Sequence, residues 1–142
     1  MKHRKPGEGG RPAEAWSNAP PFNRFIGFKD TKIGPGQWLI ELEAKPGMLN
    51  RKGDMHGGII AAVLDSAMGN AVRTYLTADH AGISTISFSV NYLEPAHGSL
   101  VARGHVVRFG STIATAEATV QDERGADVAR ATGIFRVIGV RK

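Results

Sequence analysis

The sequence predicts an α+β fold in which an antiparallel sheet of five to six strands wraps around one long central helix. Two observations lead to this prediction. The longest apolar run of the chain, from Ile59 to Val72, contains a single formally charged residue, Asp65. After Gly82, the apolar residues change from helical spacing to alternation and keep that period to the end. A helix with so few polar residues must be buried, and the rest of a 142-residue chain must surround it.

Length and an apolar content of 42% suit one domain with one core. Residues 1–19 are rich in Gly, Pro and charge, so we expect a disordered basic tail followed by a single domain over residues 20–142. The N-terminus lacks the apolar segment of a signal peptide, and the central run is too short and too polar to cross a membrane. We therefore expect a cytoplasmic protein that has no membrane partner.

The absence of cysteine excludes disulfides, thiolate catalysis and cysteine-ligated metals. The net charge is +5, but the basic residues form no run with interleaved aromatics, so a nucleic-acid partner is not expected. A moderately positive surface suits a small ligand that carries several phosphates, or it is simply solvated.

The elements are expected in the order β-β-α-β-β-β-β, after a short helical turn at Phe22–Gly27. The central helix is expected over His56–Leu76, after a loop at Met48–Met55. The predicted strands are Phe28–Ile33, Gln37–Ala44, Ile83–Leu93, Ser99–Phe109, Thr112–Asp122 and Asp127–Val140. In the third strand, alternation places Ile86, Phe88, Val90 and Tyr92 on one face, and Thr85, Ser87, Ser89 and Asn91 on the other.

Asp65 needs an explanation, because an ionised group in an apolar helix is costly without a partner. A neighbouring arginine or a capped loop is one explanation. However, the residues one turn away are Ala61, Ala62, Met68 and Gly69, which offer no partner and leave a groove where a ligand can approach. Burial should raise the pKa of the Asp65 carboxyl, and a carboxylate in such a place can act as a base or a nucleophile.

The stretch His56-Gly57-Gly58 opens the helix, where the first N–H groups lack intrahelical partners and can hold a carbonyl oxygen that becomes an oxyanion. The alternative is a tight turn with His56 as a cap. His56 and Asp65 are nine positions apart, hence on opposite sides of the helix and roughly 13 Å apart along it. If both act on one small substrate, the site must be shared between two subunits. No His and Asp share one-turn spacing, so no metal site is expected.

Asn50, Gly53, His56-Gly57-Gly58 and Asp65 together resemble the hotdog-fold acyl-CoA thioesterases of the phenylacetate-pathway (PaaI-like) type. The stretches GISTISFSVNYLEPA and HVVRFGST are also similar to that family, and the resemblance covers residues 22–138. It implies a hotdog fold and a homo-oligomer, either a dimer or a homotetramer built from two dimers. It also implies an acyl-CoA substrate, with no metal and no further cofactor.

The resemblance implies roles for these residues. Asp65 would be the general base or nucleophile at the thioester carbonyl. The amide of Gly58 (or Gly57), helped by Asn50 of the partner chain, would polarise that carbonyl. Thr85 (Ser84 if the register slips by one) would bind the attacking water, for which a solvent-facing strand threonine is the alternative. His56 would position the thioester or the leaving thiolate.

Substrate-binding residues are expected in two further places. Arg108, in the hairpin before Gly110, is the first candidate contact for the CoA phosphates, and Gly110 is expected at the same site. Arg103 and Arg136 are the second choices. The acyl pocket is expected to be formed partly by Met48, Leu49, Met68 and Val72. We expect hydrolysis of a small-to-medium acyl- or aryl-CoA thioester to free acid and CoA. A hotdog protein that senses acyl-CoA without cleaving it is the alternative, and the related dehydratases are a more distant one, because no histidine lies within the helix.

Overall fold

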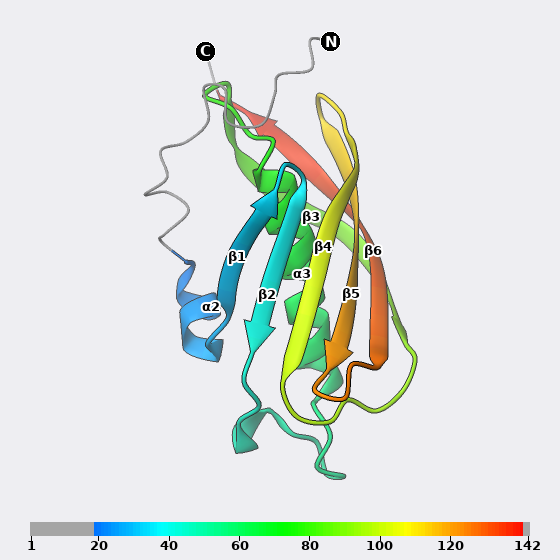
Figure 1. Ribbon diagram of the computed structural model, residues 1–142. Helices are drawn as coiled ribbons and strands as arrows, with labels where there is room; N and C mark the ends of the chain where they lie inside the picture. Colours follow the sequence, from blue (N-terminus) through cyan, green and yellow to red (C-terminus); the bar gives the residue numbers. More distant parts are fainter. Residues whose placement is uncertain (1–18, 141–142) are drawn as a thin grey trace.

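The structure is a computed structural model that describes residues 19–140. One six-stranded antiparallel sheet curls around the long helix α3 (Gly57–Arg73), as Figure 1 shows. The strands are β1 (Lys29–Gly34), β2 (Gln37–Leu42), β3 (His80–Tyr92), β4 (Leu100–Phe109), β5 (Ile113–Asp122) and β6 (Asp127–Gly139). This arrangement confirms the predicted hotdog fold. The tail expected over residues 1–19 lies outside the described residues except for Ala19.

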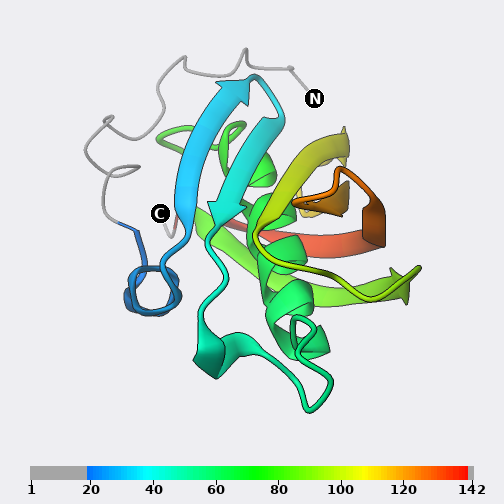
Figure 2. The same ribbon diagram turned by 60° about the horizontal axis from the view of Figure 1, so that its bottom comes forward.

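The sheet has the strand order β1-β2-β4-β5-β6-β3, so β1 and β3 form its two edges. Figure 2 shows the short helix α2 (Pro21–Ile26) beside the start of β1. The 3-10 turn η1 (Pro46–Met48) and the loop that follows lie at the end of the molecule where α3 begins. Within residues 19–140, no helix combines the length and apolarity that crossing a membrane requires.

Helix α3 is shorter than expected at both ends. His56 is its N-cap rather than its first residue, because the His56 side chain accepts a hydrogen bond from the Gly58 N–H. At the other end, the Thr74 hydroxyl donates to the Ala71 carbonyl at 2.7 Å and accepts from the Gly36 N–H at 2.7 Å. This second bond ties the end of α3 to the β1–β2 turn, and the helix stops at Arg73.

The expectation that α3 is buried all round is wrong. Its sheet-facing side is buried at Ile60, Val63, Leu64, Ala67, Met68, Ala71 and Val72. The opposite side, which carries Ala61, Ala62 and Asp65, remains partly exposed, because a single sheet covers only one side of a helix. On the covered side, Gly104 of β4 lets the two backbones approach, since a Cβ there would overlap the Ala67 carbonyl.

Candidate active site

Asp65 and Thr85 meet between α3 and β3. The Thr85 hydroxyl donates a hydrogen bond of 2.9 Å to Oδ1 of Asp65. Asp65 lies in the middle of α3 and is partly exposed, and Thr85 is exposed on the edge strand. The carboxylate and the hydroxyl are therefore oriented by each other, and both can be reached from outside the chain.

A β-bulge in β3 puts Thr85 in this position. Thr85 pairs with Phe135, but Ser87 already pairs with Ile134, which leaves Ile86 as an extra residue without a partner in register. Phe135 is fully buried, whereas Ile134 is exposed, so Thr85 lies on the face of the sheet that carries the helix. The expectation that simple alternation continues through β3 is wrong at this point.

Beyond the bulge, Phe88, Val90 and Tyr92 pair with Gly133, Ala131 and Ala129, which are all buried. These three residues were expected on the face opposite Thr85, and the bulge brings them to the same face. Ile86, expected to share their face, is 53% exposed. The extra residue therefore determines which hydroxyl faces α3.

The carboxylate of Asp65 has no cationic partner among the described residues. Neutralisation by a neighbouring arginine, the structural explanation for this acid, therefore does not apply within residues 19–140. Burial raises the pKa of the Asp65 carboxyl above its ordinary value, and the hydrogen bond from Thr85 opposes that shift. Such a carboxylate is a stronger base than an exposed one and can take a proton from water.

The two glycines at the start of α3 differ in their hydrogen bonds. The Gly58 N–H donates to Nδ1 of His56 at 2.9 Å. The Gly57 N–H, by contrast, has no acceptor within residues 19–140. Since Nδ1 of a neutral His56 is an acceptor here, its proton is on Nε2, which leaves this second nitrogen as a donor. Of the two expected donors, Gly57 thus has the free amide at this helix end, while the amide of Gly58 is occupied.

Asn50 shapes the loop that leads into α3. Its Oδ1 accepts from the N–H groups of Lys52 at 2.9 Å and Asp54 at 3.1 Å. Its Nδ2 makes no hydrogen bond to the described residues and is therefore a second available donor. The loop is held further by the His56 N–H, which donates to the Met48 carbonyl at 2.8 Å. Asn50 and Gly57 are thus both presented by a fixed loop-to-helix junction.

One chain does not bring these groups together with Asp65. Gly57 opens α3 and Asp65 lies eight positions later, so roughly 12 Å separates them along the helix. The structure thus unites Asp65 with Thr85, and Asn50 with His56 and Gly57, as two half-sites.

The expected acyl-binding residues Met68 and Val72 have no exposed surface, because both point from α3 into the sheet. Direct contact with an acyl chain does not agree with this burial. The expected CoA contacts lie elsewhere: Arg108 is exposed near the end of β4, and Gly110, which is partly buried, follows it in the β4–β5 hairpin. Figure 1 places that hairpin at the end of the molecule opposite the start of α3.

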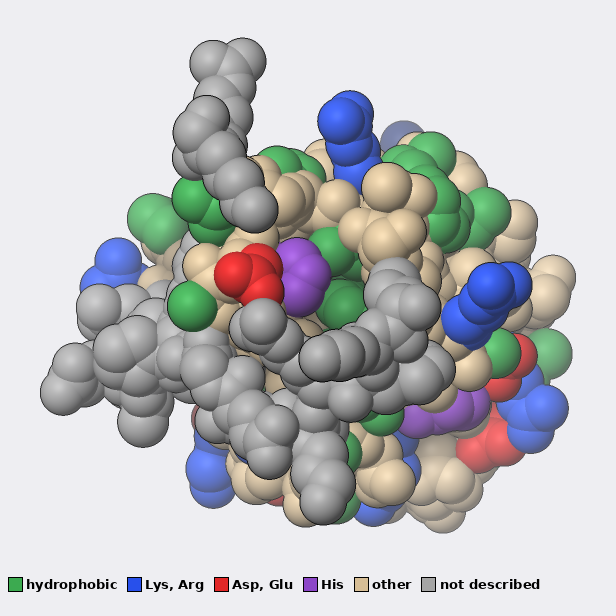
Figure 3. All heavy atoms as spheres, turned by 90° about the horizontal axis from the view of Figure 1, so that it is seen from above, with side chains coloured by type: hydrophobic (Ala, Val, Ile, Leu, Met, Phe, Trp, Pro, Cys, Tyr) green, Lys and Arg blue, Asp and Glu red, His purple; other side chains and the backbone are tan. Residues whose placement is uncertain are grey.

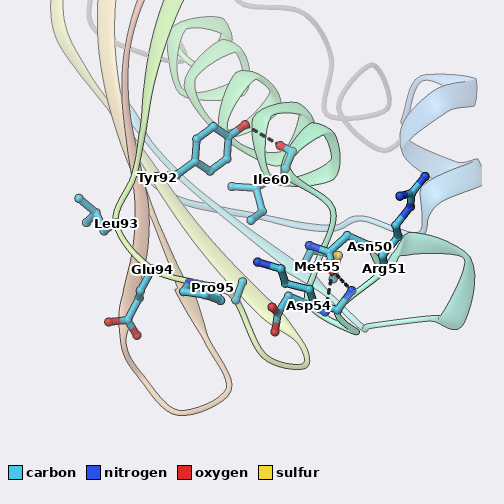
Figure 4. Close-up of a pocket in the computed structure, with 12 residues that line it drawn as sticks. Asn50, Arg51, Asp54, Met55, Ile60, Tyr92, Leu93, Glu94 and Pro95 are labelled. Carbon is cyan, nitrogen blue, oxygen red and sulfur yellow. Dashed lines mark hydrogen bonds between the residues drawn. The ribbon is translucent and has the colours of Figure 1, made fainter.

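A pocket of about 570 Å³ lies instead at the start of α3. Figure 4 shows Tyr92 and Ile60 on one side of it and the loop carrying Asn50, Arg51 and Asp54 on the other. The Tyr92 hydroxyl donates to the Gly57 carbonyl at 2.7 Å and so fixes the first peptide of the helix. Sequence reasoning missed Tyr92, Arg51 and Lys52 as site residues. Arg51 and Lys52 directly follow Asn50, which was an available signal, whereas only the fold brings Tyr92 to the site.

Residues 52–129 match the family model described as "Thioesterase superfamily". They include the start of α3, Asp65 and Thr85. The chain belongs to the thioesterase superfamily. This confirms the resemblance to hotdog acyl-CoA thioesterases and supports thioester hydrolysis as the general activity.

Two relatives illustrate the range of proteins to which this chain is similar. A Halobacterium salinarum protein called "Putative esterase" is 37% identical over 123 residues, which cover 80% of this chain and 82% of that protein. An Escherichia coli protein named medium/long-chain acyl-CoA thioesterase YigI is 27% identical over 132 residues, covering 82% and 85%.

Solved structures agree with the fold of this chain. A thioesterase family protein from Silicibacter pomeroyi has a TM-score of 0.82 at 26% identity, covering 90% of this chain and 96% of that one. A Bacillus halodurans protein, whose crystal structure was determined with CoA, has a TM-score of 0.78 at 26% identity, covering 91% and 87%.

Proposed function

We propose that this protein is an acyl-CoA thioesterase that hydrolyses a small-to-medium acyl- or aryl-CoA thioester to free acid and CoA. The observation that carries the proposal is the Asp65–Thr85 pair, a partly buried carboxylate that has a hydroxyl partner but no cation. The acyl-CoA thioesterase among its relatives and the CoA in the Bacillus halodurans structure support the substrate class.

Asp65 is the general base or the nucleophile in this proposal. As a base, it takes a proton from a water bound by Thr85 while the water oxygen attacks the thioester carbonyl carbon. The C–S bond then breaks, the CoA thiolate leaves and takes a proton, and the free acid remains. As a nucleophile, the carboxylate attacks the same carbon, the C–S bond breaks as the CoA thiolate leaves, and water hydrolyses the resulting mixed anhydride to free acid and the Asp65 carboxylate. Neither route uses a metal or a further cofactor.

The negative charge that develops on the carbonyl oxygen requires donors fixed in advance. We assign this role to the Gly57 N–H and to Nδ2 of Asn50, because neither has another acceptor within residues 19–140. His56 holds the neighbouring Gly58 amide through Nδ1 and presents Nε2 toward the thioester or the leaving sulfur. Tyr92 acts as a positioning residue, since its hydroxyl holds the Gly57 carbonyl.

The proposal also requires two subunits, because Gly57 and Asp65 of one chain are too far apart along α3 to meet one carbonyl. The free edge of β3 offers a way to join them, since an edge strand presents unpaired backbone groups. On this strand, Thr85 lies beside Asp65 of the helix, to which it is hydrogen-bonded, and Tyr92 lies beside Gly57 in the same way.

Two β3 strands can pair antiparallel with Thr85 opposite the partner's Tyr92. Each dimer would then contain two complete sites, each made of the Asp65 half-site of one subunit and the Gly57 half-site of the other. The residue midway between Thr85 and Tyr92, once the extra residue of the bulge is discounted, is Ser89. We therefore place the two-fold axis of the dimer at Ser89. Two such dimers would form the tetramer that the sequence resemblance implies.

A screen of the purified protein against acyl- and aryl-CoA thioesters, with detection of released thiol, tests the activity. We expect one or more thioesters to be cleaved, with mass spectrometry showing equal amounts of free acid and CoA. Recovery of intact acyl-CoA bound to the protein, with no cleavage across the panel, would favour the sensor instead.

A further inference from the structure

We propose that Arg51 and Lys52 form the subsite that holds the phosphate groups of the CoA portion of the substrate. The inference rests on the proposed function and names its nucleotide-binding residues. It replaces the expectation that Arg108 does so.

Both residues line the pocket at the start of α3. The loop carrying Arg51 forms one side of this pocket and the end of β3, with Tyr92, forms the other, as Figure 4 shows. The same pocket is lined by Gly57 and Asn50, which present the free donors assigned to the thioester carbonyl. In Figure 4, the Arg51 side chain extends outward from the loop, so its guanidinium lies at the outer edge of the site.

Two cations of the pocket are available to an anion. Of its two acidic side chains, Asp54 lies 3.4 Å from Nδ1 of His97, and Glu94 lies 3.0 Å from Arg124, which also pairs with Asp122 at 2.7 Å. Arg51 and Lys52 have no side-chain partner within residues 19–140. Arg51 and Lys52 thus remain on a pocket wall as two cations without an ion-pair partner among the described residues, and low-dielectric walls strengthen the potential that they produce.

Backbone hydrogen bonds hold the loop that carries these cations in a defined shape. The Gly53 N–H donates to the Asn50 carbonyl at 3.0 Å, and Leu49 forms a bridge with Met55 across the base of the loop. The φ of Gly53 is +82°, a value that lets the chain turn back toward α3. Phosphate groups suit this pair, since an arginine binds them bidentately and a lysine as a point charge.

The three arginines that the sequence suggested as phosphate contacts are less well placed. Arg103 and Arg136 lie on β4 and β6, opposite Thr119 and Ile113, and line no part of this pocket. Arg108 lies near the β4–β5 hairpin. Figure 3 views the molecule from that end, and the Lys and Arg side chains on its visible described surface stand apart from one another.

The test compares wild type with the Arg51→Gln/Lys52→Gln variant and with Arg108→Gln, which removes an exposed cation from the opposite end of the sheet. The Kd for CoA is measured by calorimetry. The KM is measured for one acyl group carried on CoA and on pantetheine, which lacks the nucleotide phosphates. We expect Arg51→Gln/Lys52→Gln to raise the Kd for CoA and the KM for acyl-CoA by about tenfold or more, because charge-assisted hydrogen bonds are lost. Its kcat and its KM for the pantetheine thioester should stay within about twofold of wild type.

A Kd for CoA in Arg51→Gln/Lys52→Gln equal to that of wild type overturns the subsite. An equal or larger loss of CoA affinity in Arg108→Gln also overturns the subsite, as does a wild type that does not bind CoA. A wild type that cleaves no thioester, but binds CoA through Arg51 and Lys52, upholds the subsite and contradicts only the proposed hydrolysis.

Discussion

The Thr85 hydroxyl donates a hydrogen bond of 2.9 Å to Oδ1 of Asp65, across the space between an edge strand and the central helix. This bond gives the carboxylate one fixed orientation and leaves its second oxygen without a hydrogen bond to the described residues. Because no cation compensates the charge, the chemistry of the site depends on how strongly burial and this single donor oppose each other.

Replacing Asp65 by asparagine should remove catalysis and preserve the fold. We expect kcat for the best acyl-CoA to fall by about 10²–10⁴, the range typical for loss of a general base. Stability at neutral pH should be equal or higher, because a carboxylate whose pKa is raised by burial disfavours the folded state when it is ionised. Initial-rate assays measure kcat, and thermal unfolding measures the stability. Wild-type kcat in Asp65→Asn would contradict the assigned role.

The pH profile of kcat/KM should have an acid limb governed by Asp65. Activity should be lost as pH falls through the pKa of this carboxyl, which burial places above the ordinary 3.8. Thr85→Ala removes the hydrogen bond that stabilises the charged form, so the limb should move to higher pH. Thr85→Ser keeps a hydroxyl and should leave it in place. An acid limb that Thr85→Ala leaves unmoved would show that another group governs it.

The shared site predicts a specific covalent dimer. In Ser89→Cys, two cysteines would lie directly opposite each other across the β3–β3 seam, with Cα atoms about 4.5–5.5 Å apart, which suits a disulfide. The natural chain contains no cysteine, so mild oxidation and a non-reducing gel report only this contact. Ser87→Cys is the matched control, since its two copies would be roughly 13 Å apart. Cross-linking of Ser87→Cys in place of Ser89→Cys would refute the register.

The close contact between α3 and β4 predicts a large effect on stability. Gly104→Ala adds a methyl group that overlaps the Ala67 carbonyl, so we expect unfolding to become easier by about 1–3 kcal/mol. Gly34→Ala, where nothing lies within 4 Å of the added Cβ, should have little effect. Urea unfolding of both variants measures the difference. Equal midpoints would mean that the helix and sheet adjust their spacing freely.

Much of the fold could be predicted because its signals are local. The change from helical spacing to alternation after Gly82 identified α3 and the strands that follow, and turn residues located their ends. Asp65 was also conspicuous from sequence, since no other charge interrupts its apolar run. The buried side chains of Met68 and Val72 were misassigned to the pocket because an apolar run does not show which side of a helix the sheet covers.

The sequence by itself determined the helix-and-sheet architecture and the identity of the isolated acid, because each follows from residue types and their period. Only the tertiary structure decided which groups meet. An extra residue at Ile86 shifts the alternation of β3 and turns Thr85 toward Asp65, and that shift depends on pairing with β6. Likewise, the bond between Gly58 and His56 leaves Gly57 as the free amide, and such a choice between adjacent donors depends on three-dimensional geometry.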